Sequence, residues 1–245
     1  MTGIQPFTHR TNRLLTALDP DDFGLLAPDL ETLELKHGQV LYETGATVGW
    51  AYFPHDAIVS LVNELENGGT VEVAVFGHEG GLGLLSGMVT HQAFGRYVVQ
   101  VPGTASRIRV ERLNEAAKIR PTLRRLVLRY GEVLLTQTFQ TLTCNAVHSV
   151  EARCCRWILN MHDRLDLDTL PLTHEFLSGM LGVQRSTVSV AVGTLQAAGL
   201  VRQRRSEIVI TDRTGLEART CECYGRIRRV YERLLPETYP RTLPR

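Results

Sequence analysis

The sequence predicts an α+β protein that consists of a jelly-roll-like β-barrel, a long helix and a winged helix-turn-helix. Three observations lead to this fold class. Short β-like runs at close spacing fill residues 32–110, and a helical stretch with a single glycine extends over residues 122–145. Near the C-terminus, two helix-like segments joined by a glycine precede a basic hairpin. This order indicates a sensing module followed by an output module.

Length and composition are those of a globular chain of about two domains. The chain has 245 residues, of which 43% are hydrophobic and 22% charged. No secretory signal and no run as long as a membrane span is present, so we expect a cytoplasmic protein without membrane contact. The five cysteines have no paired CxxC spacing and predict neither a disulfide framework nor a metal site.

The basic excess lies in the second half of the chain. Residues 1–120 hold 9 basic and 14 acidic side chains (net −5), 121–147 hold 3 and 1 (net +2), and 148–245 hold 15 and 11 (net +4). All cations after residue 120 are arginines, whose planar fork suits phosphate and base recognition. A general bias toward arginine would give the same count, so charge alone is weak support for nucleic-acid binding.

Six runs rich in β-branched and aromatic residues form the expected barrel. Alternation is clearest where Val71, Val73 and Val75 share one face. Glycine-containing turns separate the runs, and the turn at residues 66–69 predicts a hairpin. The runs are Val40–Tyr42, Trp50–Phe53, Ile58–Leu65, Val71–Phe76, Tyr97–Val101 and Ile108–Val110.

The long helix is predicted to begin at Pro121, a residue well suited to the first turn, after a shorter helix over Glu111–Ile119. One stripe of the long helix has alternate spacings of three and four, the period of a coiled-coil seam. We predict that this stripe is a dimer interface, and packing of the helix on its own barrel is the alternative. The stripe consists of Val127, Tyr130, Leu134, Gln137 and Thr141, continued by Cys144.

Two further helices flank the predicted DNA-binding motif. Ser149 is a candidate N-cap for a helix whose apolar face includes Cys154, which we therefore assign to the core. The tail from Thr214 to Leu235 is predicted as one helix with an apolar stripe and arginines between.

The segment Leu172–Val201 has the layout of a helix-turn-helix. Thr173 is placed to cap a short helix, Gly182 permits a tight turn, and Arg185 begins the second helix. The residues expected to face inward are Phe176, Leu177, Met180 and Leu181, then Val183 in the turn, then Val188, Ala191, Val192 and Leu195.

The side chains on the exposed face of the second helix are expected to be small and polar. A helix with one arginine on such a face can enter a major groove, where the arginine pairs with guanine. After Gly199 the sequence LVRQRRSEIVITD predicts a wing whose arginines contact phosphates. A two-helix hairpin with a solvated basic loop is the structural alternative, which the combined features disfavour. The outward residues are Arg185, Ser186, Ser189 and Gly193 on the helix and Arg202, Arg204 and Arg205 on the wing.

From about Leu25 to Asp212, the order of barrel, long helix and motif resembles the Crp/Fnr regulators, the cyclic-AMP receptor protein family. The resemblance implies a cyclic-nucleotide-binding-like sensor barrel (1–120), a dimerisation helix (121–147) and a winged helix-turn-helix domain with a C-terminal helix (148–245). It also implies a homodimeric transcription regulator that binds double-stranded DNA at a pseudo-palindromic site, contacts RNA polymerase and is not an enzyme. The matching motif residues are Gly182, Arg185, Thr187, Val188, Leu195 and Gly199.

The resemblance also implies roles for individual residues of the motif. Arg185 corresponds to the first base-reading position and Thr187 to a phosphate contact, while Thr173 and His174 approach the DNA backbone. Well-studied members have glutamate and a second arginine where this chain has Ser186 and Val190. We therefore expect an operator different from that of the cyclic-AMP receptor, because an acceptor for cytosine and a second guanine reader are absent.

The effector is not identified by the sequence. In cyclic-nucleotide binders of the family, a glutamate binds the ribose and an arginine followed by a hydroxyl residue holds the phosphate. Glu79 and Gly80 lie at a plausible place, and Arg96 supplies a cation. Tyr97 follows that arginine where a hydroxyl residue such as serine or threonine is expected, so a cyclic nucleotide is disfavoured.

Other sensor chemistries of the family find little support. An iron–sulfur cluster is not expected, because the N-terminal half contains no cysteine. A haem with one axial histidine leaves no spacing signature, and the candidates His37, His55, His78 and His91 are more often ordinary surface or packed residues. Oxidant sensing by the pairs Cys154–Cys155 and Cys221–Cys223 is a further alternative.

Two functions of other classes remain as alternatives. A cupin-like barrel enzyme requires an HxH ligand motif, which this chain lacks. A protein-binding adaptor that responds to cyclic nucleotides would leave the arginines of the wing without a role. Both alternatives therefore fit the sequence less well than a DNA-binding regulator.

Overall fold

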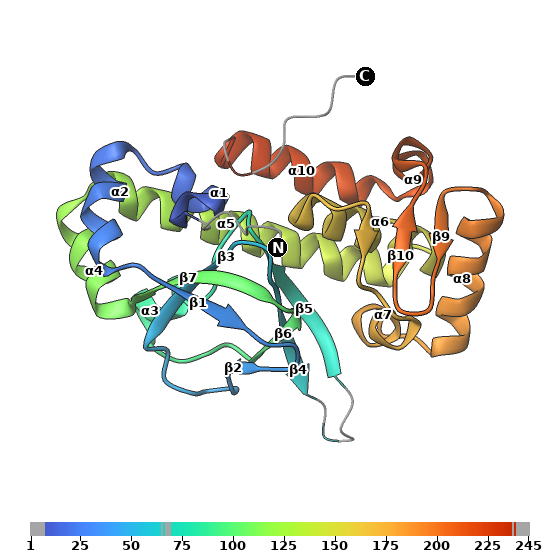
Figure 1. Ribbon diagram of the computed structural model, residues 1–245, viewed down its shortest axis with the longest axis horizontal. Coiled ribbons are helices and arrows are strands. Elements are labelled where there is room, and N and C mark those ends of the chain that lie inside the picture. The colour runs from blue at the N-terminus through green and yellow to red at the C-terminus, as the bar shows by residue number, and fades with distance from the viewer. Residues whose placement is uncertain (1–7, 65, 67–69, 237, 239–245) are drawn as a thin grey trace, which may run out of the picture.

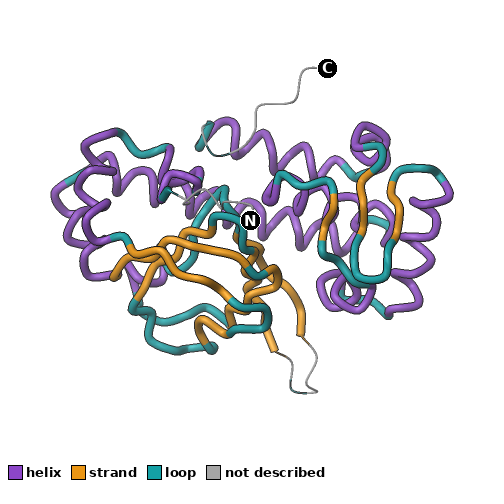
Figure 2. Tube along the Cα trace, viewed as in Figure 1, coloured by secondary structure: helices purple, strands orange, loops and turns teal. Residues whose placement is uncertain are grey.

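The computed structural model describes residues 8–64, 66, 70–236 and 238. A β-sandwich forms one end of the molecule and a mainly helical domain the other, and one long helix, α5, passes behind both (Figure 1). The tube in Figure 2 shows strands gathered at the first end, with a small sheet in the second. Within the described residues, no helix has both the length and the hydrophobicity of a membrane span.

Two antiparallel sheets make up the N-terminal barrel, which confirms the predicted fold class. One sheet has the strand order β1-β7-β3 and the other β2-β6-β4-β5. Apolar side chains from both sheets, including Tyr52, Val99 and Ala105, form one buried cluster. The strands are β1 (Glu31–Leu35), β2 (Val40–Tyr42), β3 (Trp50–Pro54), β4 (Ile58–Glu64), β5 (Thr70–Phe76), β6 (Arg96–Val101) and β7 (Gly103–Arg109).

The predicted run Ile108–Val110 includes only the last two residues of β7, and Val110 begins α4. Strand β1 was not predicted at all. Its side chains are mostly exposed and only Leu35 is fully buried, so it lacks the apolar alternation of the other strands. It is fixed instead by pairing along its whole length with β7. The hairpin turn predicted at residues 66–69 lies largely outside the described residues.

Short helices close the barrel and lead into α5. They are η1 (His9–Thr11), α1 (Arg13–Thr16), α2 (Pro20–Leu26), η2 (Ala27–Asp29), α3 (Leu84–Val89) and α4 (Val110–Ile119). Helix α5 extends over Pro121–Val147, with Pro121 in its first turn as predicted. Asn12 ties the N-terminal segment to the barrel, because its amide donates to the carbonyl oxygens of Pro54 and Gly80.

The C-terminal domain surrounds a second apolar cluster. Its sheet has the order β8-β10-β9, and Ser149 caps α6 by accepting a hydrogen bond from the amide of Ala152. Cys154 lies in the core, as predicted. The elements are α6 (Val150–Leu165), β8 (Thr169–Leu170), α7 (His174–Leu181), α8 (Arg185–Ala197), β9 (Val201–Gln203), β10 (Ile208–Ile210), α9 (Arg213–Arg219) and α10 (Glu222–Leu234).

The tail forms two helices, so the prediction of one continuous helix is wrong. Thr220 and Cys221 are extended between α9 and α10. This break places Leu216 in the core of the C-terminal domain while Ile227 packs in the cluster beneath the N-terminal helices. The apolar residues do recur with helical spacing, but those of α9 and those of α10 pack against different partners.

A buried ion pair joins the two ends of the molecule. The carboxylate of Glu79, in the turn after β5, accepts a hydrogen bond from Arg164 of α6 at 2.8 Å, and the two side chains are 0% and 1% exposed. Arg164 also donates to Gln137 of α5 at 3.2 Å, and Tyr231 of α10 donates to the same amide oxygen at 3.4 Å. The barrel, α5, α6 and α10 therefore meet at one polar network.

We expect Glu79→Gln to lower the free energy of unfolding by about 3–5 kcal/mol, because it removes the carboxylate that pairs with the buried guanidinium of Arg164. Urea denaturation followed by circular dichroism measures this change. Glu31→Gln is the matched control, since it removes an exposed ion pair with Arg107 that contributes about 1 kcal/mol or less. A loss for Glu79→Gln no larger than that of the control would contradict the structural role assigned to the pair.

Candidate nucleic-acid interface and sensor cavity

Helices α7 and α8 form the helix-turn-helix. The hydroxyl of Thr173 accepts a hydrogen bond from the amide of Phe176 at 3.1 Å and so caps α7. Gly182 ends this helix with φ of +63°, a conformation that a side chain would disfavour, and the amide of Val183 returns to Ser178 at 3.1 Å. The chain then enters α8 at Arg185.

Helix α8 has one buried and one free face. Val188, Ala191, Val192 and Leu195 pack into the domain core, as the sequence predicted. The opposite stripe is exposed, and its side chains are small. It consists of Ser186, Val190, Gly193 and Ala197, with Arg185 and Ser189 at its edge. Val190 is 71% exposed, so this face presents an apolar contact to whatever approaches it.

The two helices are linked at the end that bears Arg185. His174 of α7 shares a hydrogen bond of 2.9 Å with the hydroxyl of Ser189, which also donates to the backbone carbonyl of Arg185 at 3.0 Å. Thr173, Thr187 and Ser186 are exposed around this point, and His174 is half-buried. The residues predicted to contact DNA from the two helices thus lie on a common side of the domain.

The predicted wing is a hairpin of β9 and β10. Ile208 pairs with Gln203 and Val209 with Arg202. The amide of Gln203 donates to the side chain of Gln196 in α8 at 2.8 Å, which fixes the wing beside the second helix. Gly199, with φ of +74°, makes the turn between them. The three predicted wing residues Arg202, Arg204 and Arg205 are exposed.

Residues 152–219 match the family model of the Crp-like helix-turn-helix domain. The C-terminal domain is a Crp-like helix-turn-helix domain. The match includes both helices of the motif and the wing, and it confirms the inferred resemblance for this part of the chain. No curated protein matches the sequence significantly.

Solved structures extend the similarity from the Crp-like domain to the barrel and long helix. FixK2 from Bradyrhizobium japonicum has a TM-score of 0.68 at 16% identity, over 78% of this chain and 98% of that chain. A putative Crp/Fnr-family transcriptional regulator from Eubacterium rectale has a TM-score of 0.64 at 17% identity, over 86% and 98%. The c-di-GMP responsive global regulator CLP from Xanthomonas campestris has a TM-score of 0.64 at 16% identity, over 78% and 99%. The chain therefore has the fold of Crp/Fnr-type transcription regulators.

The structure does not bring the three predicted effector ligands together. Glu79 is buried in its ion pair with Arg164 and offers no surface to a ligand. Gly80 packs under Tyr130, whose hydroxyl a Cβ at residue 80 would overlap. Arg96 forms ion pairs with Glu43 and Glu64. The assignment of Glu79 and Gly80 to the effector is thus corrected, because Glu79 belongs to the contact between the barrel and α6 and Gly80 to that between the barrel and α5.

A cavity of about 540 Å³ lies instead between the barrel and α5. Side chains from the barrel, including Leu61, Phe76 and Tyr97, line one side, and α5 contributes Leu128 and Leu135. Among the described residues that line it, the one charged side chain is Glu132. A cavity without a lining cation is a poor site for a cyclic phosphate and a better one for an apolar molecule.

The stripe predicted as a dimer seam faces the inside of the protomer. Val127, Tyr130 and Gln137 are buried, and the hydroxyl of Tyr130 accepts a hydrogen bond from the amide of Gly81 at 3.0 Å. Leu134 and Thr141 are partly buried beside them. The stripe thus packs within the protomer, on the barrel at Tyr130 and against α6 and α10 at Gln137.

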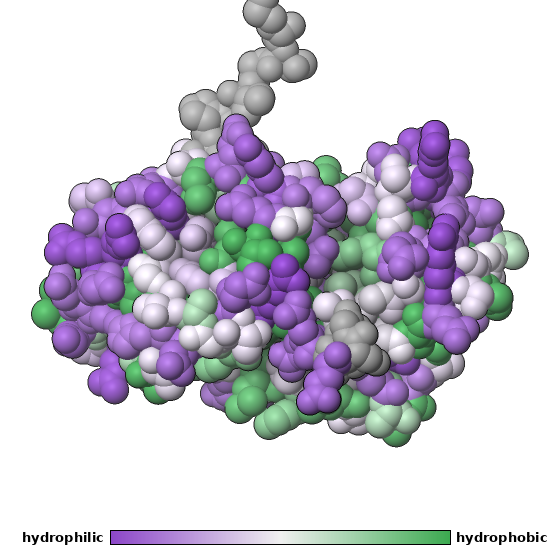
Figure 3. Space-filling model, turned by 90° about the horizontal axis from the view of Figure 1, so that it is seen from below, coloured by the Kyte–Doolittle hydropathy of each residue, from purple (hydrophilic) through white to green (hydrophobic). Residues whose placement is uncertain are grey.

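Two groups of residues on or near α5 were not predicted from the sequence. Five large apolar residues of this helix are exposed. Four of them, Leu128, Leu135, Phe139 and Leu142, follow one another at intervals of seven, four and three residues, and the fifth is Val147. Hydrophobic surface is visible along the lower edge of the space-filling view (Figure 3). The second group comprises Cys144, His148, Cys221 and Cys223, whose Cys-x3-His and Cys-x-Cys spacings were the available signal.

A partly buried carboxyl group lies where the Crp-like domain contacts the barrel. Glu72 of β5 accepts hydrogen bonds from Ser60 at 2.6 Å and from the indole of Trp157 in α6 at 3.0 Å. Burial raises the pKa of Glu72 to about 7, although these two hydrogen bonds act in the opposite direction. The carboxyl group is therefore poised to ionise near neutral pH inside the contact.

We expect the ionisation of Glu72 to weaken this contact as the pH rises. In the unfolded chain a glutamate has a pKa of about 4.3. Since its folded-state pKa is higher, the folded protein binds more protons between the two values, and stability falls as the pH rises toward 7. Glu72→Gln removes the ionisation and keeps the capacity for both hydrogen bonds, so its melting temperature should exceed that of the wild type at pH 8 and approach it near pH 5.

Thermal unfolding at a series of pH values measures the difference between the two proteins. Glu64→Gln, on the neighbouring strand, is the control, because its carboxylate is about half exposed. A difference between Glu72→Gln and wild type that does not change with pH would show that Glu72 does not titrate in this range.

Proposed function

We propose that the chain is a homodimeric, sequence-specific DNA-binding transcription regulator of the Crp/Fnr type. The observation that supports this most directly is the free face of α8, which is exposed, small in its side chains and flanked by arginines of the helix and the wing. In this proposal residues 1–120 are the sensor, 121–147 the dimerisation helix and 148–245 the DNA-binding domain. The protein acts in the cytoplasm, where it contacts RNA polymerase, and has no catalytic role.

The free face of α8 suits a major groove. Arg185, at the first turn, is placed to donate to the O6 and N7 atoms of guanine. Val190 offers an apolar contact to a thymine methyl group. Gly193, whose Cβ position has open space around it, allows the helix to approach the bases closely. Ser186 and Ser189 complete the base-facing group.

The surrounding residues are proposed to position the helix on the DNA backbone. Thr173 and His174, at the start of α7, and Thr187 lie beside the exposed face. Arg202, Arg204 and Arg205 extend from the wing on its other flank. Contacts of these side chains with phosphates would fix the register of α8 without reading sequence.

The dimer is proposed to form through the exposed stripe of α5. Phe139 lies opposite the buried Gln137 on the helix circumference and is 58% exposed. Together with Leu128, Leu135 and Leu142 it repeats at intervals of three, four and seven residues, as in a coiled-coil seam. Two protomers joined in this way would present their α8 helices to half-sites about 34 Å apart.

An effector of the sensor is proposed to be an uncharged, mainly apolar small molecule. The cavity between barrel and α5 is large enough for such a ligand and has no lining cation among the described residues. Leu128 and Leu135 belong both to its lining and to the proposed dimer stripe. A ligand would thus contact the surface on which the second protomer packs, and so bias the relative orientation of the two protomers.

We expect Arg185→Ala to weaken binding to the selected operator by about 1–3 kcal/mol and to relax the preference for guanine at one position of each half-site. The operator comes from selection of bound sequences from a random DNA pool, and gel shifts at several salt concentrations give the affinities. Arg202→Ala is the comparison: removal of a phosphate contact should weaken binding to all sequences alike and reduce the salt slope by about 1. Equal losses on operator and random DNA for Arg185→Ala would contradict base reading.

We expect Phe139→Asp to shift the protein from dimer to monomer, because it places a charge in the centre of an apolar seam. Analytical ultracentrifugation measures the change, and operator affinity should fall with it. Leu167→Asp, an equivalent change at an exposed leucine in the loop after α6, is the control and should remain dimeric. If Phe139→Asp remains as dimeric as the control, the dimer interface does not lie on this stripe of α5.

A further inference from the structure

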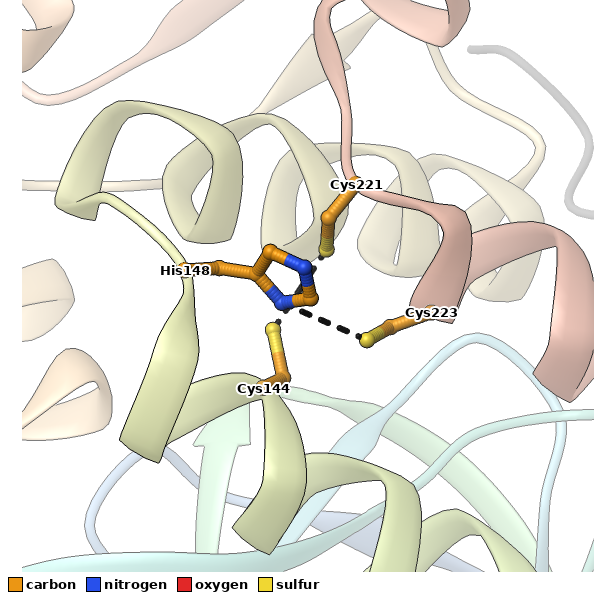
Figure 4. Close-up of side chains that lie close together, drawn as sticks. All are labelled: Cys144, His148, Cys221 and Cys223. Carbon is orange, nitrogen blue, oxygen red and sulfur yellow. Dashed lines mark hydrogen bonds between the residues drawn. The ribbon is translucent and has the colours of Figure 1, made fainter.

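Four side chains suited to metal binding converge between α5 and α10. Cys144, His148, Cys221 and Cys223 point toward one another across a small gap (Figure 4). One potential ligand atom from each lies within 4.8 Å of all the others. The three thiols are buried and the imidazole is 19% exposed. None of the four belongs to the proposed DNA-binding face or lines the sensor cavity.

The local fold explains why these residues meet. Cys144 and His148 lie one turn apart at the end of α5, where the amide of His148 donates to the carbonyl of Cys144 at 3.1 Å. Cys221 is the N-cap of α10 and Cys223 lies in its first turn. The break between α9 and α10 turns the start of α10 toward α5, so the pairs from distant parts of the sequence face each other.

Two of the separations are close to those of ligands around one tetrahedral ion. The sulfur atoms of Cys144 and Cys221 are 3.4 Å apart, and the sulfur of Cys223 is 3.6 Å from Nδ1 of His148. Zinc bonds of about 2.3 Å to sulfur and about 2.0–2.1 Å to nitrogen place tetrahedral ligands roughly 3.8 Å apart for two sulfurs and roughly 3.6 Å for sulfur and nitrogen. Only small side-chain movements therefore separate the observed arrangement from a closed coordination sphere.

The outer partners of the cluster are also those of a metal site. Nε2 of His148 lies 3.1 Å from the carboxylate of Glu222, so its proton is held there and Nδ1 presents a lone pair to the sulfurs. Gln140 donates a hydrogen bond to the sulfur of Cys223 at 3.0 Å, as to a thiolate ligand. A carboxylate that orients a ligating histidine through its second nitrogen recurs in zinc proteins.

Cys154 and Cys155, the two cysteines outside the cluster, have the environment of purely structural thiols. Cys154 and Cys155 lie in the apolar core of the C-terminal domain. Burial raises the pKa of both thiols to about 12, so they remain protonated and unreactive. Neither belongs to the cluster of ligand atoms around His148.

We propose that Cys144, His148, Cys221 and Cys223 bind one Zn²⁺ in a closed, tetrahedral, structural site. Three thiols lose their protons to solvent on binding and the imidazole stays neutral, so the ion and its ligands have a net charge of −1. Thiolate and imidazole ligands in tetrahedral geometry favour zinc over magnesium or calcium. With four protein ligands the site has no open position for catalysis.

The ion would connect the end of the proposed dimerisation helix to the first turn of α10. His148 is also one of the two residues that join α5 to α6, so the site lies at the connection between the long helix and the Crp-like domain. Binding of zinc would therefore restrict the angle between these parts. The proposal does not depend on DNA binding, and its test uses readouts that DNA binding does not affect.

The first measurement is the metal content of the full-length protein, purified under reducing conditions without chelators or a metal-affinity tag. Mass spectrometry of elements should find one zinc per protomer in the wild type and none in Cys144→Ser or Cys221→Ser. Cys154→Ala is the matched control, because it removes a buried thiol outside the cluster, and should retain zinc. Cobalt added to the apoprotein should give the charge-transfer and ligand-field bands of tetrahedral thiolate coordination.

Glu222→Gln keeps the test valid if the cysteine variants do not fold. Glu222 is 58% exposed, so its substitution preserves the core while it weakens the orientation of His148. We expect a 10–100-fold loss of zinc affinity, about the effect of losing an outer partner, in competition with a chromophoric chelator. Glu232→Gln, at an exposed position of the same helix, should bind as the wild type does.

Three results would overturn the proposal. The first is that the wild-type protein contains no more zinc than Cys144→Ser and gives no tetrahedral cobalt spectrum. The second is unchanged affinity in Glu222→Gln. The third is a disulfide between Cys144 and Cys221 in protein whose thiols are alkylated before cell lysis, which would assign the cluster to redox chemistry instead.

Discussion

The ion pair between Glu79 and Arg164 determines how the parts of this chain are placed. A carboxylate and a guanidinium that are both out of contact with water are tolerated only together, because either one alone would be a buried, uncompensated charge. Glu79 comes from a turn of the barrel and Arg164 from the last turn of α6. The C-terminal domain can therefore not move away from the barrel without exposing or separating both charges, and Gln137 and Tyr231 add α5 and α10 to the same constraint.

Local signals in the sequence were sufficient for most elements. Thr173, Gly182 and Gly199 act on their immediate neighbours through capping and positive φ, and each does what its residue type indicates. The sequence did not determine which partner an apolar stripe of a helix packs against. Periodicity places Tyr130 and Gln137 on one face of α5 but does not say whether that face meets the barrel or a second protomer. For the same reason, α9 and α10 were predicted as one helix. Their apolar residues share one spacing but pack in different clusters.

The candidate sites show the same division between local and long-range information. The motif residues of α7 and α8 are close in sequence, so their common exposed side was predictable. Glu79 lies in a glycine-rich segment typical of an anion site, yet its partner is 85 residues away in the chain and no local pattern indicates it. Cys144 and Cys221 are 77 residues apart and became a pair only through the break before α10. In both cases a contact between distant segments decided the chemistry of the side chain.

Helix α10 has a mechanical consequence for the whole molecule. Its first turn packs beside Cys144, Tyr224 joins the core of the C-terminal domain, and Ile227 and Tyr231 reach the cluster beneath the N-terminal helices. One rigid rod is thus anchored in three separate clusters, alongside α5 (Figure 1). Stretching the two ends of the protein apart would have to pull this rod out of every anchor at once.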